Sequence, residues 1–209
     1  MKTVILRRFT TAAVLLFAAT GVIAKPNTVE NLKAASAGIK DEQDRLAVQS
    51  ALAEFSASPQ LKEFFANSYG VVIFPTIGKA GLGVGGAHGT GWGFREGRLD
   101  GESKMTQLTV GAQAGAQAFS QIIFFEDAAA FNKFASGNFE LGAQASAVAI
   151  TAGANAQAST AGGASAGAGD TQKKANYKDG LAIFTAAKGG LMYEASVGGQ
   201  KFSYKAMTK

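Results

Sequence analysis

The sequence predicts an α+β protein in which N-terminal helices pack on an antiparallel, barrel-like or sandwich arrangement of Gly/Ala-rich strands. Three observations predict this fold. Apolar residues recur at helical spacing over residues 28–66, small residues alternate with others over much of the remainder, and glycines punctuate the last third. Without an N-terminal leader over residues 1–24, about 185 residues remain, a length that suits one domain with a full hydrophobic core. We therefore expect a single domain over residues 25–209.

Residues 1–24 have the composition of a secretory signal peptide. Three basic residues precede an apolar run over 12–19, and the segment ends in Val-Ile-Ala before Lys25. The apolar run is well short of the roughly 20 residues that a membrane span needs. We expect transport across the inner membrane with cleavage before Lys25, and a periplasmic location if the organism has two membranes. The chain has no cysteine, which excludes disulfides and a lipid-modified N-terminal cysteine.

The charge balance gives little support to nucleic-acid binding. The whole chain has 20 Lys plus Arg and 15 Asp plus Glu, and three of the basic residues lie in the leader. The remainder is close to neutral, whereas nucleic-acid-binding domains are usually strongly basic. From Thr171 onward there are seven lysines and two acids, so this end could face an anionic surface.

Residues 28–66 predict three helices. Asn27 or Thr28 can cap the first, Asp41 the second, and Ser58-Pro59 begins the third. The apolar positions follow i, i+3, i+4 spacing, which is typical of helices lying on a core.

The stretch 69–94 carries a glycine at nearly every second position. An apolar run ending at Pro75 predicts a buried strand, and the glycines after it predict a hairpin with close backbone approach. Gly81, Gly83 and Gly86 match G-x-G-x-x-G, but the residues that follow do not predict the helix that a dinucleotide site needs. A nucleotide-binding fold is not expected.

Alternation continues beyond the glycine stretch. Over 107–121 the even positions are mainly alanine and the odd ones mainly Gln, Gly and Thr, which predicts a long strand or a bent pair with a closely packed alanine face. A short helix from Glu126-Asp127 to Gly137 follows. The remaining predicted elements are small-residue alternation over 139–149, a loop or strand pair over 151–169, and strands over 180–186, 190–196 and 200–204 separated by glycine turns.

Seven short sequence blocks match motifs of a known domain family, and they occur in the same order as in that family. They are Gly70-Val-Val-Ile-Phe-Pro75, Gly78-Lys-Ala-Gly81, Gly85-Gly86, Gly89-Thr-Gly91, Gly111-Ala-Gln-Ala-Gly-Ala-Gln117, Phe139-Glu-Leu-Gly142, and Leu181 through Lys188-Gly-Gly-Leu191 to Gly198-Gly199. In these residues the chain resembles the SYLF domain family over roughly residues 30–205. The segment 95–104 departs from the family, because it lacks the tryptophan and the proline that are common there, so ligand contacts from that segment are not inferred.

The resemblance implies a domain that binds phosphoinositide-containing membranes. Some fungal members also bind actin, but the leader argues for a compartment without actin. An N-terminal amphipathic helix takes part in membrane contact in the family, and here Lys33 and Lys40 flank the first predicted helix.

Two lysines have surroundings that suit phosphate. Lys79 lies between Gly78 and Ala80-Gly81, and Lys188 precedes two glycines, so small neighbours would leave the ammonium groups and backbone N–H groups accessible. The alternative is two lysines that solvate glycine turns. With the resemblance, the candidate lipid-binding residues are Lys79, Lys188, Lys33, Lys40 and His88.

The sequence offers few side chains for catalysis, with one histidine and no cysteine. His88 is the single histidine, and it lies in the glycine-rich stretch without an acid nearby in sequence, which does not favour a serine triad. Zinc ligands are too few. Paired carboxylates for glycosidic cleavage would meet only in the fold. We expect no enzyme, no cofactor and no metal.

The sequence thus predicts an exported, non-enzymatic lipid-binding module of the cell envelope that recognises anionic or phosphorylated head groups. Its expected partner is an anionic lipid or membrane surface. The alternatives are a structural, self-assembling envelope protein that stacks its Ala/Gly/Gln strands, an integral outer-membrane protein, for which the alanine faces lack large apolar residues and aromatic girdles, and an enzyme if His88 and several carboxylates converge.

Overall fold

The computed structural model describes residues 26–142, 148–149 and 176–207, and within them it shows an α+β fold built on one antiparallel sheet. The expected α+β class with N-terminal helices on an antiparallel sheet is confirmed, and the sheet is not closed. Among the described residues, no helix is long and apolar enough to cross a membrane.

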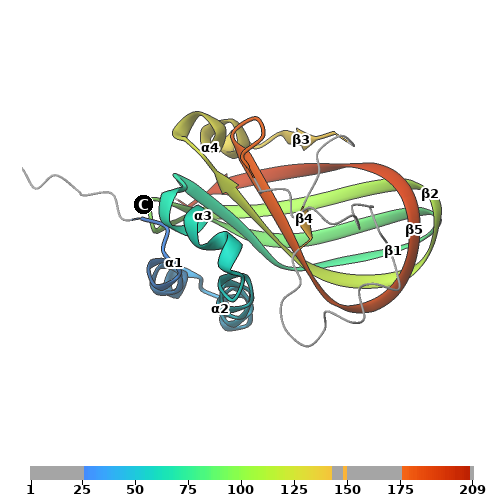
Figure 1. The fold of residues 1–209 in the computed structure, drawn as a ribbon, viewed down its shortest axis with the longest axis horizontal. Coiled ribbons are helices and arrows are strands. Elements are labelled where there is room, and N and C mark those ends of the chain that lie inside the picture. The colour runs from blue at the N-terminus through green and yellow to red at the C-terminus, as the bar shows by residue number, and fades with distance from the viewer. Residues whose placement is uncertain (1–25, 143–147, 150–175, 208–209) are drawn as a thin grey trace, which may run out of the picture.

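Three long strands make most of the sheet, and they lie in the order β1, β2, β5. They are β1 (Gly70–Arg95), β2 (Arg98–Phe125) and β5 (Leu181–Ala206). β3 (Phe139–Leu141) adds to β5 in antiparallel fashion, and β4 (Val148–Ala149) pairs with β5 in parallel. Figure 1 shows the long strands running away from the helices and curving round together at the far end.

β1 folds back on itself near its midpoint. Gly83 has φ +70° there, and the pairing with β2 shifts register between Leu82 and Val84. Glycines let the two halves of the strand approach. A Cβ added at Gly91 would lie 2.5 Å from Cδ1 of Phe74, one at Gly89 would lie 2.7 Å from Cγ1 of Ile77, and one at Gly81 would lie 2.6 Å from Cα of Gly85. At Gly81, Gly89 and Gly91, glycine is therefore required for packing between the two halves of β1.

The hairpin expected within 69–94 is instead the junction of β1 and β2. Glu96 and Gly97 have φ values of 50° and 70°, the positive pair of a type I′ turn. Asn27 fixes the turn by accepting a hydrogen bond from the Gly97 N–H at 2.8 Å. Pro75 does not end a strand but lies inside β1, where the pairing with β2 shifts register.

The predicted helices are confirmed with their caps. α1 (Val29–Ala35) begins after Thr28, and α2 (Glu42–Ser56) begins after Asp41, whose carboxylate accepts from the Asp44 N–H at 3.0 Å. Between them lies η1 (Ser36–Gly38). The third predicted helix is a short 3₁₀ turn, η2 (Pro59–Leu61), followed by α3 (Lys62–Asn67). α4 (Ala128–Ala135) is capped by Asp127 and is followed by Gly137 at φ 96°.

Two clusters of buried side chains hold the helices against the sheet. The first lies under α1, α2 and α3, where Phe64 packs on Phe124 and Phe184 with ring centroids 5.5 and 5.1 Å apart. The second lies under α4, where Phe134 packs on Phe125 and Phe202. Most residues of both clusters lie toward the helical end of the sheet, and none of the described helices covers the curved end of the strands.

The closing segment differs from its prediction. The three strands expected over 180–204 form one continuous strand, β5, and the glycines read as turns lie within it. Gly189 sits where the pairing with β2 shifts, and a Cβ at Gly198 would lie 2.3 Å from the Leu108 carbonyl oxygen. Of the alternation over 139–149, β3 and β4 are strands, while 143–147 and the segment 151–169 lie outside the described residues.

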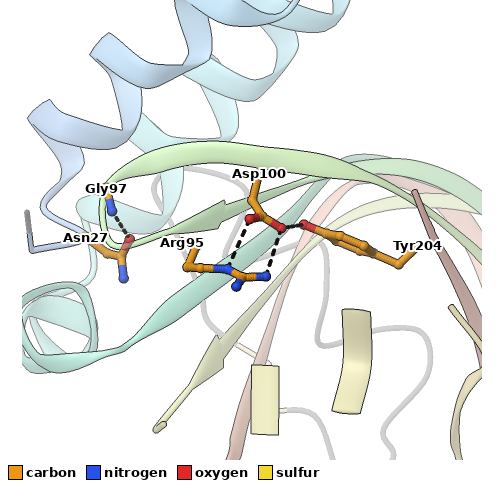
Figure 2. Close-up of polar contacts among 5 residues, drawn as sticks. All are labelled: Asn27, Arg95, Gly97, Asp100 and Tyr204. Carbon is orange, nitrogen blue, oxygen red and sulfur yellow. Dashed lines mark hydrogen bonds and ion pairs between the residues drawn. The ribbon is translucent and has the colours of Figure 1, made fainter. Parts of the chain in front are cut away.

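A polar cluster ties β5 to the β1–β2 turn (Figure 2). The Tyr204 hydroxyl donates to Oδ2 of Asp100 at 2.7 Å, and Arg95 places Nε 3.0 Å from Oδ1 of the same carboxylate. The Arg95 guanidinium also lies over the Phe131 ring, 4.8 Å from its centroid. Burial, followed by the hydrogen bond to Asp100, raises the pKa of Tyr204 well above its usual value.

This cluster predicts alkaline destabilisation. Burial, aided by Glu126, also raises the pKa of Tyr177 to about 12. Because both tyrosines keep their protons longer in the folded state, their stability contribution is complete below about pH 10 and is lost as pH rises above it. We expect Tyr204→Phe to lessen the fall in unfolding free energy between pH 10 and 12 by up to ~1.4 kcal/mol per pH unit. Urea unfolding across that range checks this, and an unchanged slope would contradict it.

Candidate lipid-binding surface

Large apolar side chains are exposed where the long strands curve. We call this part of the sheet the distal bend, comprising residues 80–86 of β1 and 106–116 of β2. Its exposed fractions are 83% for Leu82, 58% for Val84, 65% for Leu108 and 56% for Val110. Val84 pairs directly with Val110, Gly86 pairs with Leu108, and Leu82 pairs with Ala114. The four large side chains therefore occupy neighbouring rows of the sheet.

The opposite face of the distal bend is polar and closed. Gln113 and Thr109 are 5% and 2% exposed. The Gln113 side chain accepts from the Thr109 hydroxyl at 2.8 Å and donates to the carbonyl oxygens of Gly83 and Thr109, each at 3.2 Å. Its amide is thus fully engaged, as burial requires. A Cβ at Gly85 would lie 2.6 Å from Oε1 of Gln113, so glycine makes room for this amide.

Residues 107–121 lie in a strand, as predicted. Over the distal bend, however, the alanine face is exposed and the opposite face is buried, which is the reverse of the prediction. Ala112, Ala114 and Ala116 are exposed rather than closely packed, and the glutamine and threonine face is buried. The reason is the narrow interior of the folded-back strand, which accepts Gln113 beside glycines and closes on it through hydrogen bonds. The polar residues are inside and the apolar residues outside.

Charge is unevenly distributed along the sheet. The curved half of the long strands, residues 76–91, 104–121 and 186–201, contains four lysines and a single acid, Glu194. The lysines are Lys79, Lys104, Lys188 and Lys201. Glu140 of β3 lies opposite Lys201. Most other acids belong to the helices, the β1–β2 turn and the ends of the strands near the helices, namely Glu30, Asp41, Glu42, Asp44, Glu54, Glu63, Glu96, Asp100, Glu102, Glu126, Asp127 and Asp179. Three of these lysines, Lys104, Lys188 and Lys201, are exposed, so positive charge exceeds negative charge on the curved half of the three long strands.

The structure separates the predicted lipid-binding residues. Lys188 is exposed, and its ammonium donates to the Thr76 hydroxyl at 3.2 Å. His88 is exposed on β1, opposite Thr106 of β2. These two lie on the sheet. Lys33, partly buried in α1, and Lys40, exposed just before α2, belong to the helical end.

Lys79 corrects one expectation. Its glycine and alanine neighbours were expected to leave the ammonium accessible, but the residue is only 7% exposed. Lys79 occupies an inward position of β1, in the same alternation as buried Ile77, whereas its small neighbours Gly78 and Ala80 face out. Small neighbours in a strand do not expose a side chain that points to the other face.

The sequence reading missed the large apolar residues of the distal bend. A signal was present, because Leu82 and Val84 flank Gly83, and Leu108 and Val110 share a strand face with alanines while the other face carries amides. The pattern shows that the two faces differ, but it does not show which of them is buried. The G-x-G-x-x-G glycines lie within β1 with no helix after them.

The comparison with protein families matches the C-terminal part of the chain, which includes the β2 residues of the distal bend. Residues 106–206 match the model of the Ysc84 family, described as Las17-binding protein actin regulator. This range covers all of β5 and β2 from Thr106 onward. No curated protein matches the chain. This match confirms the family suggested by the sequence motifs over residues 106–206, which match the Ysc84, or SYLF, domain, a lipid-binding family.

Proposed function

We propose that this protein is an exported, non-enzymatic module of the cell envelope that binds lipids through anionic or phosphorylated head groups. The observation that carries the proposal is the distribution of charge, since the three long strands of the curved half carry three exposed lysines, Lys104, Lys188 and Lys201, and one acid. A surface of this kind is attracted to anionic lipid, at about 1 kcal/mol for each lysine near the membrane. The leader-like residues 1–24 support export, and export favours a lipid over actin as the partner.

Lys188 is the strongest single candidate on this surface. Its ammonium contacts a neutral hydroxyl, so its charge is not offset by a carboxylate within that contact. In contrast, Lys201 is paired with Glu140 at 3.1 Å, and Lys104 lies 3.9 Å from Glu102. A head-group phosphate would therefore meet Lys188 with the least competition. His88 is exposed on the same half of the sheet.

Vesicle co-sedimentation tests the proposal. We expect the purified protein to pellet with phosphatidylglycerol-containing vesicles, not with phosphatidylcholine alone, and to dissociate as salt rises from 0.05 to about 0.5 M. Lys188→Ala should weaken binding about fivefold, which corresponds to the ~1 kcal/mol of one lysine. Lys133→Ala, an exposed lysine of α4, is the matched control and should bind normally. Equal binding to neutral vesicles, or none to either, would overturn the proposal.

Lys40→Ala separates the two ends of the molecule in the same assay. Because Lys40 lies at the helical end among acids, its loss should change binding less than the loss of Lys188. A larger effect of Lys40→Ala would move the contact surface to the helices.

A further inference from the structure

We infer that the distal bend is a membrane anchor, with Leu82, Val84, Leu108 and Val110 entering the outer apolar layer of an anionic bilayer. The inference rests on the proposed function and names the part of the molecule that meets the lipid. Scattered exposed apolar residues are normal on proteins. These four are instead grouped at one end of the sheet, are more than half exposed, and occupy neighbouring rows.

The register of the sheet holds these residues outside. A slip by one residue would exchange the faces, but it would expose Gln113 and break its three hydrogen bonds. It would also place a side chain where Gly85 and Gly81 leave room for Gln113. The outward position of Leu82 and Val84 is therefore built into the fold.

The backbone of β2 in the distal bend suits an apolar surrounding. Entry into a bilayer is costly for any unpaired N–H or carbonyl group. β2 lies between β1 and β5, and Leu108 and Val110 have partners on both strands. At Gly83, where the pairing of β1 is interrupted, the carbonyl oxygen accepts from the Gln113 amide at 3.2 Å. The Gly83 carbonyl group therefore has a hydrogen-bond donor inside the protein, although Gly83 has no paired residue on β2.

Charge complementarity selects the occupant. Three exposed lysines, Lys104, Lys188 and Lys201, lie on the same half of the sheet as the apolar group, and an anionic surface would attract them. A second copy of the chain would bring two cationic ends together and is disfavoured for the same reason. An anionic bilayer matches both the apolar residues and the charges around them.

Tryptophan fluorescence tests the anchor directly. The chain has one tryptophan, Trp92, which is 6% exposed, so Trp92→Phe gives a silent background. In that background, Leu82→Trp should shift to the blue on anionic vesicles and be quenched at least twofold by lipids brominated near the head-group end of the chain. Leu46→Trp is the matched control, because Leu46 is 54% exposed on α2 at the helical end, and it should show neither effect.

Loss of the apolar side chains gives an independent measurement. Leu82→Ser with Val110→Ser should weaken vesicle binding at least tenfold, while Leu46→Ser should not. Circular dichroism and thermal unfolding confirm that each variant is folded. Vesicle binding by the wild type without quenching of Leu82→Trp would overturn the anchor and leave the proposed function standing. No vesicle binding would overturn both.

Two further outcomes would assign the surface to something else. Quenching of Leu46→Trp in place of Leu82→Trp would place the membrane contact on the helices. A dimer in sedimentation velocity that Leu82→Ser dissociates, without quenching on vesicles, would show that a second copy covers the distal bend. Either result would overturn the anchor.

Discussion

Replacing Phe134 with alanine is expected to lower the free energy of unfolding by about 3–5 kcal/mol, the range for removing a fully buried phenylalanine. The Phe134 ring is 0% exposed, and it contacts both Phe125 of β2 and Phe202 of β5. Its ring centroid lies within 6 Å of four others, at 5.1 Å from Phe125, 5.3 Å from Phe139, 5.2 Å from Phe202 and 5.9 Å from Tyr204. The cavity left by the ring would be lined by aromatic side chains that are themselves constrained.

Urea unfolding followed by circular dichroism measures this loss. Lys133→Ala, one residue earlier on the exposed side of α4, is the control and should change stability by less than about 0.5 kcal/mol. A loss below about 1 kcal/mol for Phe134→Ala would mean that α4 is not anchored through this ring.

Replacing Gly91 with alanine is expected to destabilise the fold by about 3 kcal/mol, at the upper end of the cost of overpacking. The added Cβ would lie 2.5 Å from Cδ1 of Phe74 and 2.8 Å from the Ile73 carbonyl oxygen. Neither neighbour can yield easily, because Phe74 is fully buried and Ile73 contributes backbone. The two halves of β1 must move apart, and the distal bend between them loses its geometry.

Gly78→Ala is the matched control for Gly91→Ala. Gly78 lies on the same strand, and a Cβ there would meet nothing within 4 Å. We expect a stability change within about 0.5 kcal/mol of zero, since alanine also reduces the entropy of the unfolded chain. Vesicle binding should fall with Gly91→Ala and persist with Gly78→Ala. Equal stability of the two variants would argue against the folded-back strand.

The helices could be predicted because their start signals lie within short stretches of sequence. Thr28, Asp41 and Asp127 each cap a helix, and their side chains accept from backbone N–H groups as N-caps do. These interactions involve residues three apart in the sequence, so a single stretch of sequence contains all the information. The alternation over 107–121 likewise indicated a strand, because period two is a local property.

Long-range packing accounts for what the sequence reading missed. Because glycines usually mark turns, turns were predicted at Gly189 and Gly198, and β5 was predicted as separate strands. In the structure, Gly189 lies at a register shift and Gly198 permits close approach to β2. The faces of β2 and the burial of Lys79 depend on which side the folded strand encloses. Contacts between segments far apart in the sequence determine which face is buried, and neither composition nor residue spacing predicts those contacts.

The hydrogen bond between Tyr204 and Asp100 joins residues 104 positions apart, and β2 finds its partner β5 only across that distance. Strand pairing between such distant segments is slow, because the entropy of closing the loop must be lost before the contacts form. The β2–β5 ladder can be completed only after residues 181–206 have left the ribosome. A chain that stays open this long is a suitable substrate for translocation, so the topology of the sheet is compatible with passage through a membrane before folding.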